Sequence, residues 1–146
     1  MFLLLWGDDI LLFAPVHSEK LQSVRDELCC KYKMVDLVVA RAFIGIDIER
    51  DRVHGSIKLH QHRYTESILK EFGLSDTKGH DTTLEVKVKL VTGDSVLDAS
   101  EQSRYQSIVS KLMYAMVATR PYLVLAVSTL GKICSQPNKS HLAAAK

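Results

Sequence analysis

The chain has 146 residues, of which 47% are hydrophobic and 25% charged, and its formal net charge is +2. This length suits about one domain, and the composition is ordinary for a soluble globular protein. The nearly balanced charge neither requires nor excludes a nucleic-acid partner, because binding depends on where charges cluster. The three cysteines do not have the number or spacing of a disulfide framework, so we interpret them as reduced thiols; they are Cys29, Cys30 and Cys134. We therefore expect an intracellular protein, cytoplasmic or nuclear, and not a secreted one.

The apolar start of the chain, FLLLWGDDILLFAPV at residues 2–16, predicts neither a signal peptide nor a membrane span. It has no basic region before it, and Asp8 and Asp9 interrupt it. An aspartate near the centre of a membrane helix costs roughly 2.5–3.5 kcal/mol. No other stretch is long enough to span a bilayer, so we expect no membrane partner.

The same stretch predicts a β-hairpin. Residues 2–6 and 10–14 are apolar runs that have the character of buried sheet. Gly7 between them can supply the positive φ that a tight turn needs. Beyond the hairpin, Ser18 is a candidate helix N-cap, and apolar residues recur at helical spacing over 19–33. An amphipathic helix is therefore expected there.

A second hairpin and a second helix are predicted next. Apolar residues alternate from Ala42 to Ile48, and again at Ile57 and Leu59, on either side of the polar segment RDRVHGS. Helical spacing returns in QHRYTESILKEFG, where Gly73 stands at the position that ends a helix.

Residues 74–100 have the fewest structural signals, with only a short alternating piece over 86–90. Asp98 and Glu101 then have the spacing of a capping box. One face of the helix predicted behind them carries Tyr105, Ile108, Leu112, Met113 and Met116.

Two further helices are predicted at the C-terminal end. Pro121 suits the first position of a helix. Residues 122–134 are apolar nearly all round, which is typical of a buried helix. Ser140 is the cap candidate for a last helix that reaches Lys146.

The adjacent carboxylates of Asp8 and Asp9 raise the main functional question. Mg²⁺ prefers oxygen ligands and commonly takes one or two carboxylates together with substrate phosphates. Nucleotidyl transfer uses two such ions about 3.5–4 Å apart. A Gly-Asp turn is also a common solvated hairpin tip. The local pattern leaves both interpretations open.

The context of these carboxylates is more specific than the pair itself. LLLWGDDILLFA resembles the reverse-transcriptase palm motif in which two aspartates sit on a β-hairpin between apolar strands. The resemblance continues, in the order and approximate spacing of copia-type LTR retrotransposon polymerases, through LQSVRDELCCKYKMVDL, AFIGIDIER, IKLHQHRYTESILKEFGL, YQSIVSKLMYAMVATRP and LAVSTLGKICSQPNKSHLAAAK.

The resemblance implies an α+β fold. A partial reverse-transcriptase palm, with two β-hairpins plus helices, would be followed by thumb-like helices. Residues 1–73 would form the C-terminal half of the palm and 74–100 a connecting loop. Residues 101–146 would form the thumb-like helical region, truncated at its C-terminus.

The resemblance also implies site roles. Asp8 and Asp9 would be catalytic ligands of Mg²⁺ (or Mn²⁺), acting on an RNA/DNA primer-template and dNTPs. Phe43, Ile44 and Gly45 fall at the primer grip, a hairpin that positions the 3′ end of the primer. An ordinary strand in which Gly45 relieves crowding is the alternative.

The segment from Tyr105 to Met116 resembles the thumb helix that lies along the primer-template duplex. Core packing is the better interpretation of its apolar face. Arg104 and Lys111 on the other face are candidates for phosphate contacts, with solvated surface as the alternative.

Two other patterns are interpreted as structural. His60 and His62 lie two apart, and no cysteine or third histidine is placed to complete a tetrahedral metal site with them. The resemblance at this point involves Gln61. Lys87 and Lys89 alternate with valines, as in a half-exposed strand.

Several positions depart from the family pattern. Val38 and Ser110 replace glycines, and Tyr122 replaces an aspartate. Replacing glycine is unfavourable wherever the backbone needs φ > 0. The family's third catalytic aspartate and its fingers have no counterpart before Asp8 in this sequence.

The sequence therefore predicts a truncated, degenerate fragment of an RNA-directed DNA polymerase that is inactive alone. The missing half of the polymerase is a candidate partner. The alternative is a non-catalytic module that binds nucleic acid or associates with a polymerase.

Overall fold

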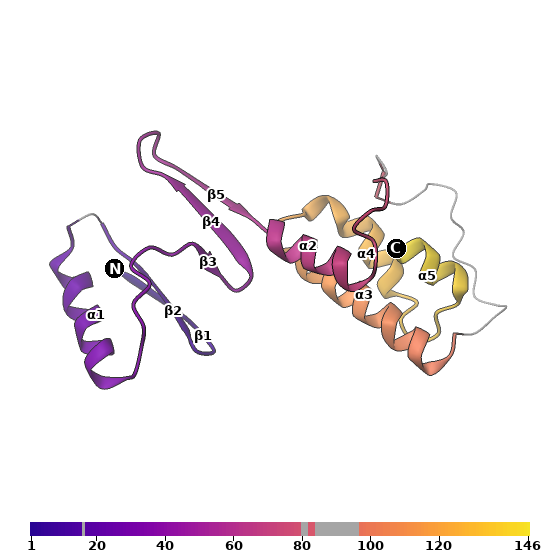
Figure 1. Cartoon of the computed structure of the whole chain (residues 1–146), viewed down its shortest axis with the longest axis horizontal. Helices are drawn as coiled ribbons and strands as arrows, with labels where there is room; N and C mark the ends of the chain where they lie inside the picture. Colours follow the sequence, from indigo (N-terminus) through magenta and orange to yellow (C-terminus); the bar gives the residue numbers. More distant parts are fainter. Residues whose placement is uncertain (16, 80–81, 84–96) are drawn as a thin grey trace. The chain divides into compact units, whose positions relative to one another are not determined.

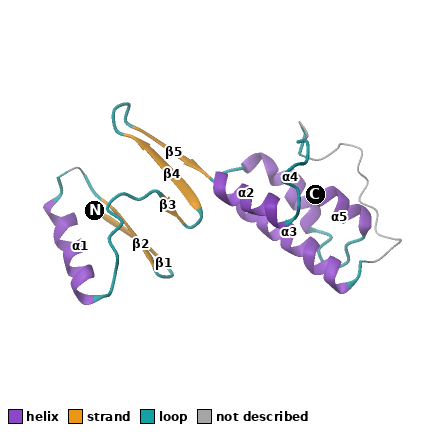
Figure 2. Ribbon diagram, viewed as in Figure 1, coloured by secondary structure: helices purple, strands orange, loops and turns teal. Residues whose placement is uncertain are grey.

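The computed structural model describes residues 1–15, 17–79, 82–83 and 97–146 (Figure 1). The chain forms two compact units, Met1–His60 and Gln61–Lys146. The first is built of β-hairpins and one helix and the second of helices, so the predicted α+β class is confirmed (Figure 2). The units divide before residue 73, where the predicted palm portion ends. The assignment of palm, loop and thumb stays a prediction.

The first unit begins with the predicted hairpin. Strands β1 (Phe2–Trp6) and β2 (Asp9–Phe13) pair antiparallel in a two-stranded sheet, with Trp6 opposite Asp9. Gly7 has a φ of +56°, the left-handed value that a two-residue hairpin turn requires. The expectation of a buried sheet is wrong, because every residue of β1 is exposed. A two-stranded ribbon has two faces, and one short helix cannot cover both.

Helix α1 (Glu19–Lys31) follows the hairpin. Its N-cap is Ser18, as predicted, and the Ser18 hydroxyl oxygen accepts a hydrogen bond from the Leu21 N–H at 3.4 Å. The loop after α1 contains Val38 at a φ of +60°. The position at which the resemblance implies a glycine is therefore one where the backbone is left-handed, a conformation that glycine adopts more easily than valine.

A three-stranded antiparallel sheet completes the first unit. Its strands are β3 (Ala42–Phe43), β4 (Ile46–Asp51) and β5 (Ser56–His60), in that order. The predicted second hairpin is confirmed, because β4 and β5 pair antiparallel. The alternating residues from Ala42 to Ile48 do not form a single strand. Ile44 and Gly45 have φ values of 51° and 69°, so the chain turns back between β3 and β4.

The second unit contains the helices α2 (His62–Glu71), α3 (Ala99–Ala118), α4 (Val124–Gly131) and α5 (Lys139–Ala145), with the 3-10 turn η1 (Pro121–Leu123) before α4. Gly73, at a φ of +70°, follows the end of α2 as predicted. These helices enclose one core, which consists of Ile68, Phe72, Leu97, Tyr105, Ile108, Val109, Leu130, Leu142 and Ala145.

The capping box that opens α3 is confirmed. Asp98 accepts a hydrogen bond from the Glu101 N–H at 2.7 Å, and the Glu101 carboxylate accepts one from the Asp98 N–H at 3.4 Å. Ile108 is buried as expected, whereas Met113 is 46% exposed and does not belong to the core.

Two C-terminal expectations need correction. Residues 122–134 are not buried all round, because Leu125 on α4 is 72% exposed while Val127 and Leu130 face the core. The cap of α5 is Asn138, not Ser140. The Asn138 side chain accepts the His141 N–H at 3.0 Å, and Ser140 donates its hydroxyl to the same oxygen at 2.7 Å.

No helix within the described ranges has the length and apolar character that a bilayer crossing requires. The strand-like pattern predicted over 86–90, with Lys87 and Lys89, lies outside the described residues.

Candidate active site

The turn of the first hairpin presents both predicted acids to solvent. Asp8 is the second residue of the turn, and Asp9 is the first residue of β2. Both are exposed. Within the described ranges, no other residue forms a hydrogen bond or an ion pair with either carboxylate. Their oxygens are therefore available to an external ligand.

The two acids border a cavity of about 500 Å³ inside the first unit. Its walls come from β2, from helix α1, from the loop after α1 and from the start of β3. Phe43 lines the same cavity. The structure thus brings Asp8, Asp9 and Phe43 to one cavity, while Ile44 and Gly45 are not among the lining residues.

The two carboxylates at this cavity are ligands of the kind that a divalent ion prefers. Mg²⁺ commonly takes one or two carboxylates and completes its shell with water and phosphate oxygens. Among the described residues, no group of three or more His, Cys, Asp or Glu side chains is placed to hold a metal. Asp8 and Asp9 alone could supply part of a coordination shell, and the remainder would have to come from a ligand.

One wall of the cavity is held by an ion pair that the sequence analysis missed. Arg25 on α1 lies 3.2 Å (Nη1–Oδ2) from Asp36 in the following loop. The other Asp36 oxygen accepts the Val38 N–H at 2.8 Å. A signal for this wall was present, because Leu21, Arg25 and Leu28 have the i, i+4, i+7 spacing of one helical face, and all three line the cavity.

The turn between β3 and β4 is strained at Ile44. Two-residue turns with both φ values positive favour Asn or Gly at the first position. Ile44 instead places a β-branched side chain there, at a φ of 51°. Left-handed non-glycine residues cost of order 1–3 kcal/mol and cluster at functional sites. This geometry departs from the ordinary strand that was the alternative for residues 43–45.

The two cations proposed for phosphate contacts lie on α3 in the second unit and serve its packing. Arg104 Nη2 donates to the Phe72 carbonyl oxygen at 3.2 Å, and its guanidinium lies 5.9 Å from the centroid of the Phe72 ring. Lys111 Nζ lies 2.9 Å from Glu71 Oε2. The hydrogen bond to Glu71 raises the pKa of Lys111, so the ammonium remains protonated. Their role toward nucleic acid stays a prediction.

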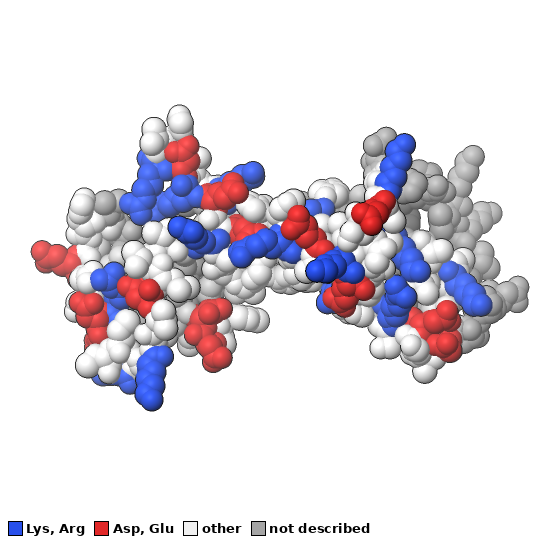
Figure 3. Space-filling model, in the orientation of Figure 1, with Lys and Arg blue, Asp and Glu red and all other residues white. Residues whose placement is uncertain are grey.

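The surface charges offer little support for an extended basic interface. On the face drawn in Figure 3, Lys and Arg side chains are interspersed with Asp and Glu side chains. Phosphate binding depends on clustered cations. Any nucleic-acid contact on this face would therefore rest on single side chains.

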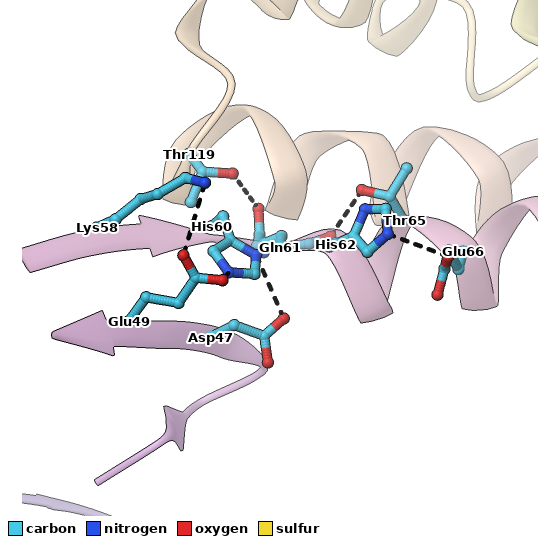
Figure 4. Close-up of polar contacts among 9 residues, drawn as sticks. All are labelled: Asp47, Glu49, Lys58, His60, Gln61, His62, Thr65, Glu66 and Thr119. Carbon is cyan, nitrogen blue, oxygen red and sulfur yellow. Dashed lines mark hydrogen bonds and ion pairs between the residues drawn. The ribbon is translucent and has the colours of Figure 1, made fainter. Parts of the chain in front are cut away.

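The histidines near the end of β5 contact different carboxylates (Figure 4). His60 lies between Asp47, at 3.6 Å, and Glu49, at 2.9 Å. The hydrogen bond from His60, followed by the charge of Lys58, lowers the pKa of Glu49. His62 instead pairs with an acid one turn along α2.

Gln61 has a structural role that its sequence position did not reveal. Its side chain is buried and accepts the Thr119 hydroxyl at 2.7 Å, while its carbonyl oxygen accepts the Thr65 hydroxyl at 2.8 Å (Figure 4). Gln61 thus fixes the start of α2 to the end of α3.

Comparison with known proteins decides the family. Residues 1–86, which include the whole cavity, match the family described as reverse transcriptase (RNA-dependent DNA polymerase). The chain belongs to this family. The predicted resemblance to copia-type reverse transcriptases is confirmed, because relatives from such transposons align along the full chain.

Three relatives show how this reverse-transcriptase segment relates to longer proteins. It is 31% identical over 153 residues to the retrovirus-related Pol polyprotein from transposon TNT 1-94 of Nicotiana tabacum, covering 100% of this chain and 11% of that one. It is 33% identical over 138 residues to an uncharacterized mitochondrial protein of Arabidopsis thaliana, covering 94% and 55%. The Pol polyprotein from transposon RE1 of the same plant is 29% identical over 148 residues, covering 100% and 10%. The chain therefore spans about half or less of the length of these relatives. No solved structure matches it.

Proposed function

We propose that this chain is the C-terminal palm portion and thumb-like region of an RNA-directed DNA polymerase, and that it is inactive by itself. The observation that carries the proposal is the shared cavity, on which two solvent-facing carboxylates and Phe43 meet although 34 positions separate Asp9 from Phe43. The family match over residues 1–86 supports the same assignment.

In this proposal Asp8 and Asp9 provide the protein ligands of Mg²⁺ or Mn²⁺. Such ions, when bound, activate the attacking hydroxyl and stabilise the leaving oxygen in nucleotidyl transfer. The hairpin contributes by holding both carboxylates on one tight turn, since Gly7 takes the left-handed conformation that other residues disfavour. The two acids are thereby kept at the rim of the cavity, where a primer-template and dNTP would bind.

The proposal gives Phe43, Ile44 and Gly45 the task of positioning the primer. Phe43 faces the cavity, and the strained Ile44 turn fixes where β3 ends. An isoleucine at a position where asparagine or glycine would be more stable suits a contact at this turn better than it suits turn stability.

The expected inactivity follows from the small number of ligands. Phosphoryl transfer depends mainly on positioning and on charge stabilisation by the metal site. In the described part of the chain only Asp8 and Asp9 among the acids combine access to the cavity with freedom from an internal ion pair, since Asp36 there pairs with Arg25. Two carboxylates leave a pair of ions under-coordinated.

Metal binding and synthesis are tested separately. Mn²⁺ titrated into ¹⁵N-labelled protein should broaden the amide signals of Gly7 to Ile10 first, and the Asp8→Asn/Asp9→Asn variant should lose this effect. Asp76→Asn, an exposed acid elsewhere, is the matched control. Equal broadening in the double variant would remove the assigned chemistry.

Primer extension with template, dNTPs and Mg²⁺ should give no product. Template-dependent synthesis by the purified chain would contradict the expected inactivity and leave the metal assignment intact.

A binding module is the second candidate, and the complete core of the second unit favours it. A folded helical unit could bind a primer-template duplex without any catalysis. This function predicts an affinity that falls steeply with salt and is unchanged in the Asp8→Asn/Asp9→Asn variant. Salt-independent binding would exclude it.

A further inference from the structure

The outer edge of β1 differs from the edge that β5 forms in the three-stranded sheet. All five side chains of β1 are exposed and none is charged; Leu5 is 60% exposed and Trp6 65%. The opposite strand, β2, has half-buried residues that line the cavity beside α1. An open, uncharged, apolar edge is a template for pairing with another strand.

Strand β5 is the matched comparison. It is also an edge strand, and its apolar residues Ile57 and Leu59 are 61% and 56% exposed. Lys58 and His60 alternate with them, however, and both pair with acids on β4. Charged residues on an edge strand oppose pairing with a further strand. The two edge strands therefore have similar apolar exposure, but β1 is suited to pairing with a further strand and β5 is not.

The backbone groups available on β1 follow from the register of its hairpin. Trp6 and Asp9 flank a two-residue turn, so they form a hydrogen-bonded pair, and such pairs recur at every second residue. Phe2, Leu4 and Trp6 thus direct their N–H and C=O groups toward β2. Leu3 and Leu5 direct theirs to the open edge.

This pattern is self-complementary. When two β1 strands lie antiparallel with Leu4 opposite Leu4, each Leu3 is opposite the Leu5 of the other copy. The outward N–H and C=O groups of these residues then meet in hydrogen-bonded pairs. The same register places Phe2 opposite Trp6 twice, and aromatic cross-strand pairs stabilise antiparallel strands.

We propose that a second copy of this chain binds along β1, antiparallel and centred on Leu4, so that two hairpins join into one four-stranded sheet. A hairpin of two strands is marginal in water, and three or more strands with an apolar face are needed for independent stability. No charged side chain occurs between residues 1 and 7, so this register opposes no like charges along β1. The inference does not rest on the polymerase function.

The first test is sedimentation equilibrium of the whole chain across a range of concentrations. We expect a monomer–dimer equilibrium. The Leu3→Lys/Leu5→Lys variant places like charges opposite one another in the proposed register and should raise the dimer dissociation constant at least about tenfold. Ile57→Lys/Leu59→Lys, the same change on β5, should leave it unaltered. Asp8→Asn/Asp9→Asn should also leave it unaltered, which separates this inference from the metal site.

A cross-link tests the register without relying on a charged variant. Opposed residues in a non-hydrogen-bonded pair have Cα atoms about 4.5 Å apart, within the range of a disulfide. With Cys29, Cys30 and Cys134 changed to Ser, Leu4→Cys should form a covalent dimer when diamide removes the two thiol hydrogens. Leu59→Cys should not.

Three results would overturn the inference. The first is a monomer at every concentration with no Leu4→Cys cross-link. The second is a polydisperse series of large assemblies in place of a dimer. The third is a dimer that the two β1 lysines leave intact while circular dichroism shows the variant to be folded.

Discussion

The two units of the chain use similar amounts of apolar sequence with different results. All of the hydrophobic residues that are buried, among those described, lie in the unit Gln61–Lys146. Among the described residues of the unit Met1–His60, Asp47 is the buried one, while Phe2, Leu5 and Trp6 are exposed. Apolar composition therefore does not determine burial. Several amphipathic helices can enclose a core among themselves, whereas hairpins need another layer against each face.

The largest difference between the two units in the free energy of unfolding is expected when one large side chain is removed from each unit. Tyr105 is fully buried and donates its hydroxyl to the Leu130 carbonyl oxygen at 2.8 Å. Tyr105→Ala should lower the free energy of unfolding of the second unit by about 3–5 kcal/mol. Leu4→Ala, at protein concentrations where the chain is monomeric, should change that of the first unit by less than about 0.5 kcal/mol. Amide hydrogen exchange in each unit measures both values, and equal effects would contradict the comparison.

Alkaline pH should also act selectively on the second unit. Burial raises the pKa of Tyr105 to about 12, above the usual value of 10.0. The neutral phenol is favoured in the folded state, so its contribution is complete below pH 10.0 and is lost as pH rises toward about 12. Thermal melts of the second unit should show this loss, and Tyr105→Phe should reduce it. An unchanged alkaline slope in Tyr105→Phe would assign the loss to other groups.

In the first unit, relieving backbone strain should raise the free energy of unfolding more than a change in packing. Val38 holds a φ of +60° and is 80% exposed. Val38→Gly should relieve about 1–2 kcal/mol of strain against an unfolded-state entropy cost of about 0.4–1 kcal/mol. The free energy of unfolding should rise by about 1 kcal/mol, as measured by exchange of the α1 amides. Val39→Gly is the control, because Val39 does not occupy the left-handed region, and it should give no gain.

The smallest effect on stability is expected from protonation of Glu49, the carboxylate on β4 that accepts a hydrogen bond from His60. The hydrogen bond from His60 lowers the pKa of Glu49, so its contribution to stability is present above the usual value of 4.5 and is lost as pH falls through the folded-state pKa. Protection of the β4–β5 amides should decline in acid, and less so in Glu49→Gln. Glu66→Gln, an exposed partner of His62, should not alter that decline.

Local signals in the sequence predicted local structure well. The turn at Gly7, the cap at Ser18 and the capping box at Asp98 are where the sequence placed them. Each depends on hydrogen bonds or φ values within a few residues. The wrong prediction at Ser140 also concerns interactions within a few residues. Asn138, two residues earlier, is a better hydrogen-bond acceptor for the unpaired N–H groups at the start of α5.

The alternation around Ile44 failed for a different reason. Period-two hydrophobicity is equally compatible with a continuous strand and with a strand that reverses at a two-residue turn. Only the pairing of β3 with β4 distinguishes the two, and Ile44 carries none of the residue preferences that signal such a turn. Met113 and Leu125 were misjudged similarly, since helical spacing shows which residues share a face and not whether another helix covers it.

The sequence by itself determined the family, the order of most elements, the turn at Gly7, the caps at Ser18 and Asp98, and the two acids of the candidate site. These features are encoded by neighbouring residues and by motifs in fixed order. Only the tertiary structure showed that Asp8, Asp9 and Phe43 border one cavity, that Arg25 and Asp36 hold its wall, and that the apolar residues of β1 are uncovered. Burial and proximity depend on distant segments of the chain, and no local pattern specifies which segments will meet.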